Sequence, residues 1–157
     1  MKRIGLFMEV SNLYHSIARQ HKDRKLDYRK YYEFVADLGE IQQAIAYGAQ
    51  RNHEAAKFIT CLKDAGYMTR FREPKEFADG TKKANWDVGM TVDMIRMVDS
   101  LDMIVLGSAD GDFAELVNYV IAKGKQVVVL ACDISYELKD VATKCIEIPL
   151  SLLEEKR

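Results

Sequence analysis

The sequence predicts an α/β fold, a three-layer α/β/α sandwich with a mostly parallel central sheet. Short apolar runs typical of strands alternate with segments of helical period along the whole chain, which is the pattern of parallel strands joined by crossover helices. Two of these runs, DMIVLG and KQVVVLA, are almost continuously apolar, as expected for strands buried on both faces. The 157 residues match the usual length of one domain, so we expect 1–157 to be a single domain.

The first half of the chain contains three predicted strands and three predicted helices. Arg3–Glu9 is a short apolar run that ends at a charge, and Ser11 or Asn12 is placed to cap a helix over Leu13–Gln20. The next elements are a helix capped by Asp27 that runs through Leu38 and stops at Gly39, a strand over Ile41–Ala49, a helix from its cap Asn52 to Ala65, and a strand over Tyr67–Arg72.

The second half begins with a polar loop over 74–84, in which Asp79 and Gly80 predict a turn. Apolar residues near helical period then predict a helix over Trp86–Ser100. The remaining predicted elements are strands over Asp102–Gly107, Lys125–Ala131 and Cys145–Ile148, helices over Asp110–Lys123 and from the cap Ser135 to Thr143, and a helical turn within Leu150–Arg157.

Composition excludes several classes of protein. The net charge is −1, hydrophobic residues make up 48% and charged residues 30%, which is ordinary globular composition. Apolar runs stay well below the ~20 residues of a membrane-spanning helix, so no membrane association is expected. Three cysteines without CxxC spacing favour a reducing, cytoplasmic location over a disulfide framework.

Acidic residues gather where the predicted strands end, and ligands bind at that edge of a parallel sheet. Glu9 ends the first strand, Asp110 and Asp112 follow the strand Asp102–Gly107, and Asp87 opens the helix before that strand. Four converging carboxylates repel one another unless a hard divalent cation, Mg²⁺ or Mn²⁺, lies between them. Such a site can activate water to attack a phosphodiester. The simpler alternative for Asp110 and Asp112 is helix capping.

Asp93 and the histidines are weaker candidates. Asp93 lies six residues after Asp87, about 120° away around a helix, so it is either a ligand at the margin of the site or an ordinary partner of a Lys or Arg. His15, His21 and His53 have no metal-like spacing. A phosphotransferase would need a nucleophilic aspartate where Glu9 stands, and the chain has no GxGxxG or Walker loop.

Six segments in order carry a family resemblance: IGLFMEVSNLY, LDYRKYYEFV, YG at 47–48, KKANWDVGMTVDM, IVLGSADGDFAELV and SYELKDVATKCIEIP. They resemble the NYN domain family, the LabA-like branch of the PIN-like nuclease superfamily, over about residues 3–149. The most specific part is KKANWDVGMTVDM followed one strand later by GSADGDF.

The resemblance implies a PIN-like fold and metal-dependent cleavage of RNA, with Mg²⁺ or Mn²⁺ as cofactor. It places Asp87, Asp110 and Asp112 on the family's acidic positions, Asp93 on a second acid of the same helix, and Asn12 on the asparagine of the first motif. The catalytic set is thus Glu9, Asn12, Asp87, Asp110 and Asp112, with Asp93 added among the metal ligands.

Four positions depart from the family pattern. Glu9 and Val10 stand where the family has aspartate and glycine, Ala109 replaces a favoured glycine, and Thr143 replaces a frequent aspartate. Glutamate reaches further than aspartate by one C–C bond, about 1.5 Å, and valine disfavours a positive φ. These changes motivate an alternative function, a catalytically silent PIN-like module that binds RNA or a protein partner.

Basic and aromatic residues near the predicted site suggest contacts with RNA. Arg19, Lys22, Arg24 and Lys25 precede the second helix, and Lys82 and Lys83 precede Asp87, where they are placed to bind phosphates. Tyr14 or Trp86 is placed to stack a base, although core packing is the simpler role for Trp86. Met90, Met94 and Met97 are expected in the core or on a self-association face, which would make the protein a homodimer.

Overall fold

A six-stranded sheet forms the centre of the protein, and all of its strands are parallel. The computed structural model describes residues 1–50, 54–80, 82–83 and 85–155. The strands lie in the order β3-β2-β1-β6-β7-β8. Their bounds are Arg3–Glu9 (β1), Glu40–Ala49 (β2), Met68–Arg72 (β3), Met103–Gly107 (β6), Gln126–Ala131 (β7) and Lys144–Glu147 (β8). The predicted α/β fold is therefore confirmed.

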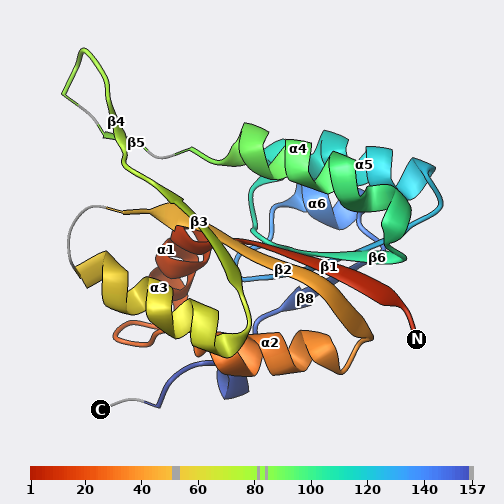
Figure 1. Ribbon diagram of the computed structural model, residues 1–157, viewed down its shortest axis with the longest axis horizontal. Coiled ribbons are helices and arrows are strands. Elements are labelled where there is room, and N and C mark those ends of the chain that lie inside the picture. The colour runs from red at the N-terminus through yellow and green to blue at the C-terminus, as the bar shows by residue number, and fades with distance from the viewer. Residues whose placement is uncertain (51–53, 81, 84, 156–157) are drawn as a thin grey trace.

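Helices cover both faces of this sheet (Figure 1). One layer holds α1 (Val10–Gln20), α2 (Tyr28–Ala36) and α3 (Glu54–Ala65), and the other holds α4 (Asp87–Met97), α5 (Ala114–Ala122) and α6 (Tyr136–Val141). The chain builds outward from β1 to β3 and then returns to place β6 on the other side of β1. Because crossovers are right-handed, this reversal moves the helices to the opposite face and opens a crevice at the carboxyl ends of β1 and β6.

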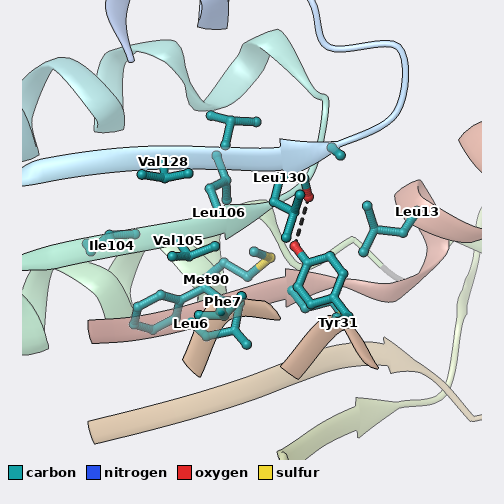
Figure 2. Packing of buried hydrophobic residues seen from close by; sticks show 14 of the residues in the cluster. Leu6, Phe7, Leu13, Tyr31, Met90, Ile104, Val105, Leu106, Val128 and Leu130 are labelled. Atoms are coloured by element: carbon teal, nitrogen blue, oxygen red, sulfur yellow. Dashed lines mark hydrogen bonds between the residues drawn. The ribbon is translucent and has the colours of Figure 1, made fainter. Parts of the chain in front are cut away.

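The core lies on both sides of the central strands, as their continuous apolar runs predict. Every residue of β6 is buried, and Met90 and Met94 of α4 pack into the same core. Figure 2 shows the buried Tyr31 hydroxyl donating a hydrogen bond to the carbonyl oxygen of Leu130, at 2.8 Å. This bond satisfies the polar end of a ring whose body fills the core. The core interpretation of the methionines is confirmed for Met90 and Met94.

The predicted caps fare differently along the chain. Asp27 and Ser135 cap their helices as expected, accepting hydrogen bonds from the backbone N–H groups of Lys30 and Leu138. The prediction that Ser11 or Asn12 caps a helix beginning at Leu13 is wrong, because α1 begins directly after β1 at Val10. Asn12 instead accepts a hydrogen bond from the loop after β6. The predicted cap Asn52 lies outside the described residues.

The stretch expected to be a loop over 74–84 contains a short antiparallel hairpin. Its strands are β4 (Lys75–Glu76) and β5 (Lys82–Lys83), and Gly80 turns the chain with a φ of 87°. Two-residue strands are too short to show any periodicity, which explains why the sequence pattern missed them. The hairpin extends from the body of the molecule just before α4 (Figure 1).

Three predicted helical segments contain 3₁₀ turns. The expected helix over Trp86–Ser100 ends as α4 at Met97 and continues as η1 (Val98–Ser100). The helix expected from Asp110 begins as η2 (Gly111–Phe113) before α5, and the predicted turn near the C-terminus is η3 (Leu150–Leu152). Within the described residues, none of the helices has the length and apolar character needed to cross a bilayer.

Candidate metal centre

Three carboxylates meet where β1, β6 and α4 come together. Glu9 is the last residue of β1, Asp110 follows β6 by three residues, and Asp87 is the first residue of α4. One carboxylate oxygen from each lies within 4.8 Å of the others. We call Glu9, Asp87 and Asp110 the acidic cluster. Their approach follows from the topology, because β1 and β6 are neighbours in the sheet and their ends share one edge.

A buried serine links two members of the acidic cluster. The Ser108 hydroxyl donates to Glu9 Oε1 at 2.8 Å and accepts from the backbone N–H of Asp110 at 3.2 Å. The Ser108 side chain is fully buried, so these bonds are shielded from water and hold both groups in place. Asp110 in turn caps η2 by accepting the backbone N–H of Asp112 at 2.9 Å.

Asn12 ties the start of α1 to the loop after β6. Its Oδ1 accepts the backbone N–H of Ala109 at 2.9 Å. This contact joins the first turn of α1 to the loop that carries Asp110, so it fixes the two sides of the crevice relative to each other. Asn12 therefore supports the site through its carbonyl oxygen, whereas its amide nitrogen is the group able to donate to a ligand.

The surroundings of Glu9 disfavour its charged form. Burial raises the pKa of Glu9 to about 7, and repulsion from Asp87 and Asp110 adds to this rise, while the hydrogen bond from Ser108 opposes it. No basic side chain of the described chain is among the groups that move this pKa. Half-buried carboxylates with acidic neighbours favour the protonated form until a cation offsets the charge.

The donor set fits a hard divalent ion. All three groups of the acidic cluster offer carboxylate oxygens from three different elements. Mg²⁺ and Mn²⁺ prefer such oxygen ligands, whereas softer metals favour sulfur or imidazole. The raised pKa of Glu9 is the property expected of a ligand that becomes a stable anion only beside a positive charge. The residues present therefore fit the predicted Mg²⁺ or Mn²⁺.

The departures at the end of β1 do not remove Glu9 from this site. Val10 is the first residue of α1, and the only described non-glycine residues with positive φ are Asp23 and Asp133. The chain thus turns from strand to helix without the conformation that would need a glycine. The longer glutamate side chain still brings an oxygen to Asp87 and Asp110.

The other two departures leave the three carboxylates of the acidic cluster in place. Thr143 Oγ1 accepts the backbone N–H of Val127 at 3.0 Å, near the start of β7 and so at the end of the sheet opposite the site. Ala109 is buried and offers its backbone N–H to Asn12.

Asp112 and Asp93 are not among the described residues that converge. Asp112 lies on η2 with an exposed side chain. Asp93 is buried on α4, where it accepts the Tyr47 hydroxyl at 2.7 Å and forms an ion pair with Arg70 of β3. Asp93 thus has the surroundings expected from the second alternative, in which it is an ordinary partner of an arginine.

The basic residues predicted to hold RNA are spread over two places. Lys22 lines a groove of about 520 Å³ at the end of α1, together with Tyr14, Arg24 and Lys25. Arg19 lies 3.9 Å from the carboxylate of Asp133. The backbones of Lys82 and Lys83 form β5, next to the start of α4.

The two aromatic candidates differ in exposure. Tyr14 is 55% exposed, but Trp86 is only 6% exposed and its indole N–H donates to the Gly48 carbonyl at 2.9 Å. The idea that Trp86 stacks a base is therefore wrong, because its ring packs against Tyr47 and two arginines. Those arginines, Arg70 and Arg72, were not predicted as site residues. Their alternation in TRFR was the available signal, since it places both on one face of a strand.

Comparison with known proteins finds a matching family model, a similar sequence and a similar fold. The NYN domain family model matches residues 3–151. Low amplitude and bright protein LabA of Synechococcus elongatus is 29% identical, and the match covers 93% of this chain and 83% of that protein. The crystal structure of a protein of unknown function from Vibrio parahaemolyticus superposes with a TM-score of 0.89 at 27% identity, covering 98% of this chain and 96% of the other.

Proposed function

Because the chain belongs to the NYN domain family, we propose that it is a metal-dependent RNA endonuclease that hydrolyses phosphodiester bonds at the acidic cluster. The observation that carries the proposal is the convergence of the Glu9, Asp87 and Asp110 carboxylates within 4.8 Å. An all-oxygen site at the carboxyl edge of a parallel sheet suits a divalent ion and an exposed anionic substrate.

The acidic cluster would hold Mg²⁺ or Mn²⁺ through Glu9, Asp87 and Asp110. When bound, such an ion lowers the pKa of water and neutralises charge that develops on the phosphate oxygens. The Ser108 hydroxyl would hold Glu9 near Asp110, because it bonds to the Glu9 carboxylate and to the Asp110 backbone N–H. Asn12 fixes the loop that carries Asp110, and its amide nitrogen would orient water or a phosphate oxygen.

RNA would reach the acidic cluster along α1 and past the hairpin. The groove is lined by Tyr14 and Ala18 of α1 and by residues 22–25 after the helix, which are Lys22, Asp23, Arg24 and Lys25. It therefore extends from the middle of α1 past its C-terminal end, away from Glu9. Tyr14 offers an exposed ring for stacking and the cations offer phosphate contacts. Arg19, Lys82 and Lys83 would add to this field, which the chain supplies locally despite its net charge of −1. We place the activity in the cytoplasm.

Calorimetric titration of Mn²⁺ into the parent protein and into Asp110→Asn tests the proposal. We expect binding in the micromolar to sub-millimolar range for the parent and loss of the binding heat in the variant, followed by Mn²⁺-dependent cleavage of RNA by the parent alone. Absence of both binding and cleavage in the parent would refute the nuclease.

The alternative is a catalytically silent module that binds RNA or a protein. It is favoured by one observation, that Glu9 replaces the family aspartate and holds a proton with a pKa of about 7, which competes with a metal ion. The double substitution Glu9→Asp with Val10→Gly separates the two functions. Cleavage that arises only in the double variant would assign the silent function to the natural chain, whereas equal cleavage by both proteins would show that glutamate is tolerated.

A further inference from the structure

Two arginines of β3 share one tryptophan ring but differ in their other partners. Arg70 and Arg72 lie two residues apart on the edge strand, so their side chains leave the same face of the sheet. The guanidinium carbon of Arg72 lies 3.5 Å from the centre of the Trp86 ring, and that of Arg70 lies 5.2 Å away. Arg70 is neutralised by Asp93. Within the described part of the chain, the Arg72 guanidinium has no carboxylate partner and no hydrogen-bond acceptor.

The Arg72 guanidinium is held in place despite lacking an acidic partner. Trp86 beneath it is buried, and its indole N–H is bonded to the Gly48 carbonyl. Gly89 leaves room for this stack, since a Cβ there would lie 2.7 Å from the Trp86 ring and 3.3 Å from a guanidinium nitrogen of Arg72. A planar guanidinium resting on a fixed aromatic face loses little further freedom when it binds a ligand.

The place of Arg72 relates it to the acidic cluster. The guanidinium lies against Gly89 and Trp86, and these residues flank Asp87 within the first turn of α4. Arg72 also ends β3, so it reaches the same carboxyl edge of the sheet as Glu9 and Asp110. The molecule therefore presents a partly exposed, rigid cation within one helical turn of a predicted metal ligand.

We propose that Arg72, stacked on Trp86, is a binding site for a backbone phosphate of single-stranded RNA, next to the phosphodiester that meets the acidic cluster. This inference takes RNA as the substrate and so rests on the proposed function. The guanidinium fork matches two phosphate oxygens, which a lysine at this position would contact only as a point charge. Arg70 cannot serve in the same way, because its charge is already paired with the buried Asp93.

Binding of a fluorescent oligouridylate, measured by anisotropy in EDTA and again in Ca²⁺, tests this site without requiring cleavage. Arg72→Met keeps the apolar stem over Trp86 and removes the charge, and Arg72→Lys keeps the charge without the fork. Arg96→Met, on the exposed last turn of the same helix α4, is the matched control for net charge. Circular dichroism and thermal melting confirm that each variant is folded.

We expect Arg72→Met to raise the Kd about tenfold, Arg72→Lys about threefold, and Arg96→Met less than about twofold. The slope of log K against log salt should fall by about 0.7 in Arg72→Met, as one phosphate contact is lost. The slope of Arg96→Met should match the parent.

Equal affinity and equal salt slope for Arg72→Met and Arg96→Met would overturn the site and leave Arg72 as a cover for the Trp86 ring. Lack of RNA binding by the parent under both conditions would also overturn it. The two proposals can fail separately. A parent that cleaves RNA with the same KM as Arg72→Met disproves only the arginine site. A parent that binds RNA through Arg72 but never cleaves it disproves only the nuclease.

Discussion

Helix α4 carries two aspartates with different described neighbours. Asp87, at its start, lies with Glu9 and Asp110, and this grouping contributes to the raised pKa of Glu9. Asp93, two turns later, is buried between the Tyr47 hydroxyl and the Arg70 guanidinium. Asp93 is paired with an arginine of the chain in the interior, whereas Asp87 belongs to a group of three carboxylates whose mutual repulsion favours a bound cation.

The largest expected difference between the two aspartates is in metal binding. Asp87→Asn and Asp93→Asn remove the same charge from the same helix. We expect Asp87→Asn to weaken Mn²⁺ binding by more than about 100-fold and to lower RNA cleavage by at least about 1,000-fold, because a ligand is lost. Asp93→Asn should stay within about threefold of the parent in both assays. An equal loss of Mn²⁺ affinity in Asp93→Asn would show that Asp93 is a ligand and remove the contrast.

The second expected difference is in how stability depends on pH. The pKa of Glu9 is raised from 4.5 to about 7 in the folded protein, so the folded state holds this proton more tightly than the unfolded state. Its stabilising contribution is complete below pH 4.5 and is lost as pH rises through 7, by at most about 3 kcal/mol.

Urea unfolding of the metal-free protein at pH 5.5 and pH 8 measures this effect. The parent should lose stability relative to Glu9→Gln as pH rises, and saturating Mn²⁺ should restore it at pH 8, because the metal binds the ionised carboxylate. If the difference in free energy of unfolding between the parent and Glu9→Gln does not change with pH, the pKa of Glu9 is not raised in the folded protein.

The fold and the acidic cluster were predictable for the same reason. Alternation of buried runs with helical segments implies a parallel sheet, and in a parallel sheet the residues after each strand meet at one edge. From the order of elements along the chain, this rule predicts that four carboxylates converge, those of Glu9, Asp87, Asp110 and Asp112. The structure brings the first three together and leaves Asp112 exposed on η2.

Contacts that depend on strand order and register could not be predicted from the order of elements alone. The pairing of Asp93 with Arg70 requires β3 to be the edge strand beside β2, with Tyr47 opposite Arg70. The sequence suggests Asn12 as a helix cap because capping depends only on local sequence. In the structure its side-chain oxygen accepts a hydrogen bond from the backbone N–H of Ala109, in a distant loop. The stacking of Arg72 on Trp86 could not be predicted either, because the periodicity of the segment around Trp86 does not show which residue packs against its ring.

A smaller effect is expected when the Asp93 pair itself is broken. Asp93→Asn should lower the free energy of unfolding by about 2 kcal/mol, because a buried charged hydrogen bond is weakened and Arg70 loses its counter-charge. The matched control is Asp99→Asn, which removes an aspartate from a pair with Lys123 whose acid is 78% exposed. Solvent screens such an exposed pair, so its loss should change the free energy of unfolding much less. Urea unfolding at pH 7 would contradict the assignment if both variants lost the same amount.

The smallest effect expected is that of Tyr47→Phe, and it also separates the two regions by their response to pH. Burial raises the pKa of Tyr47 above its ordinary value, and the hydrogen bond to Asp93 raises it further, so the hydroxyl stays protonated and keeps donating across the neutral range. Removing it should cost about 1 kcal/mol, and that loss should be the same at pH 5.5 and at pH 8. Mn²⁺ affinity should not change, because Tyr47 contacts Asp93 rather than the acidic cluster. A Tyr47→Phe loss that varied with pH as the Glu9→Gln difference does would mean that the two sides of α4 titrate as one site, and the distinction between a structural and a functional carboxylate on this helix would fail.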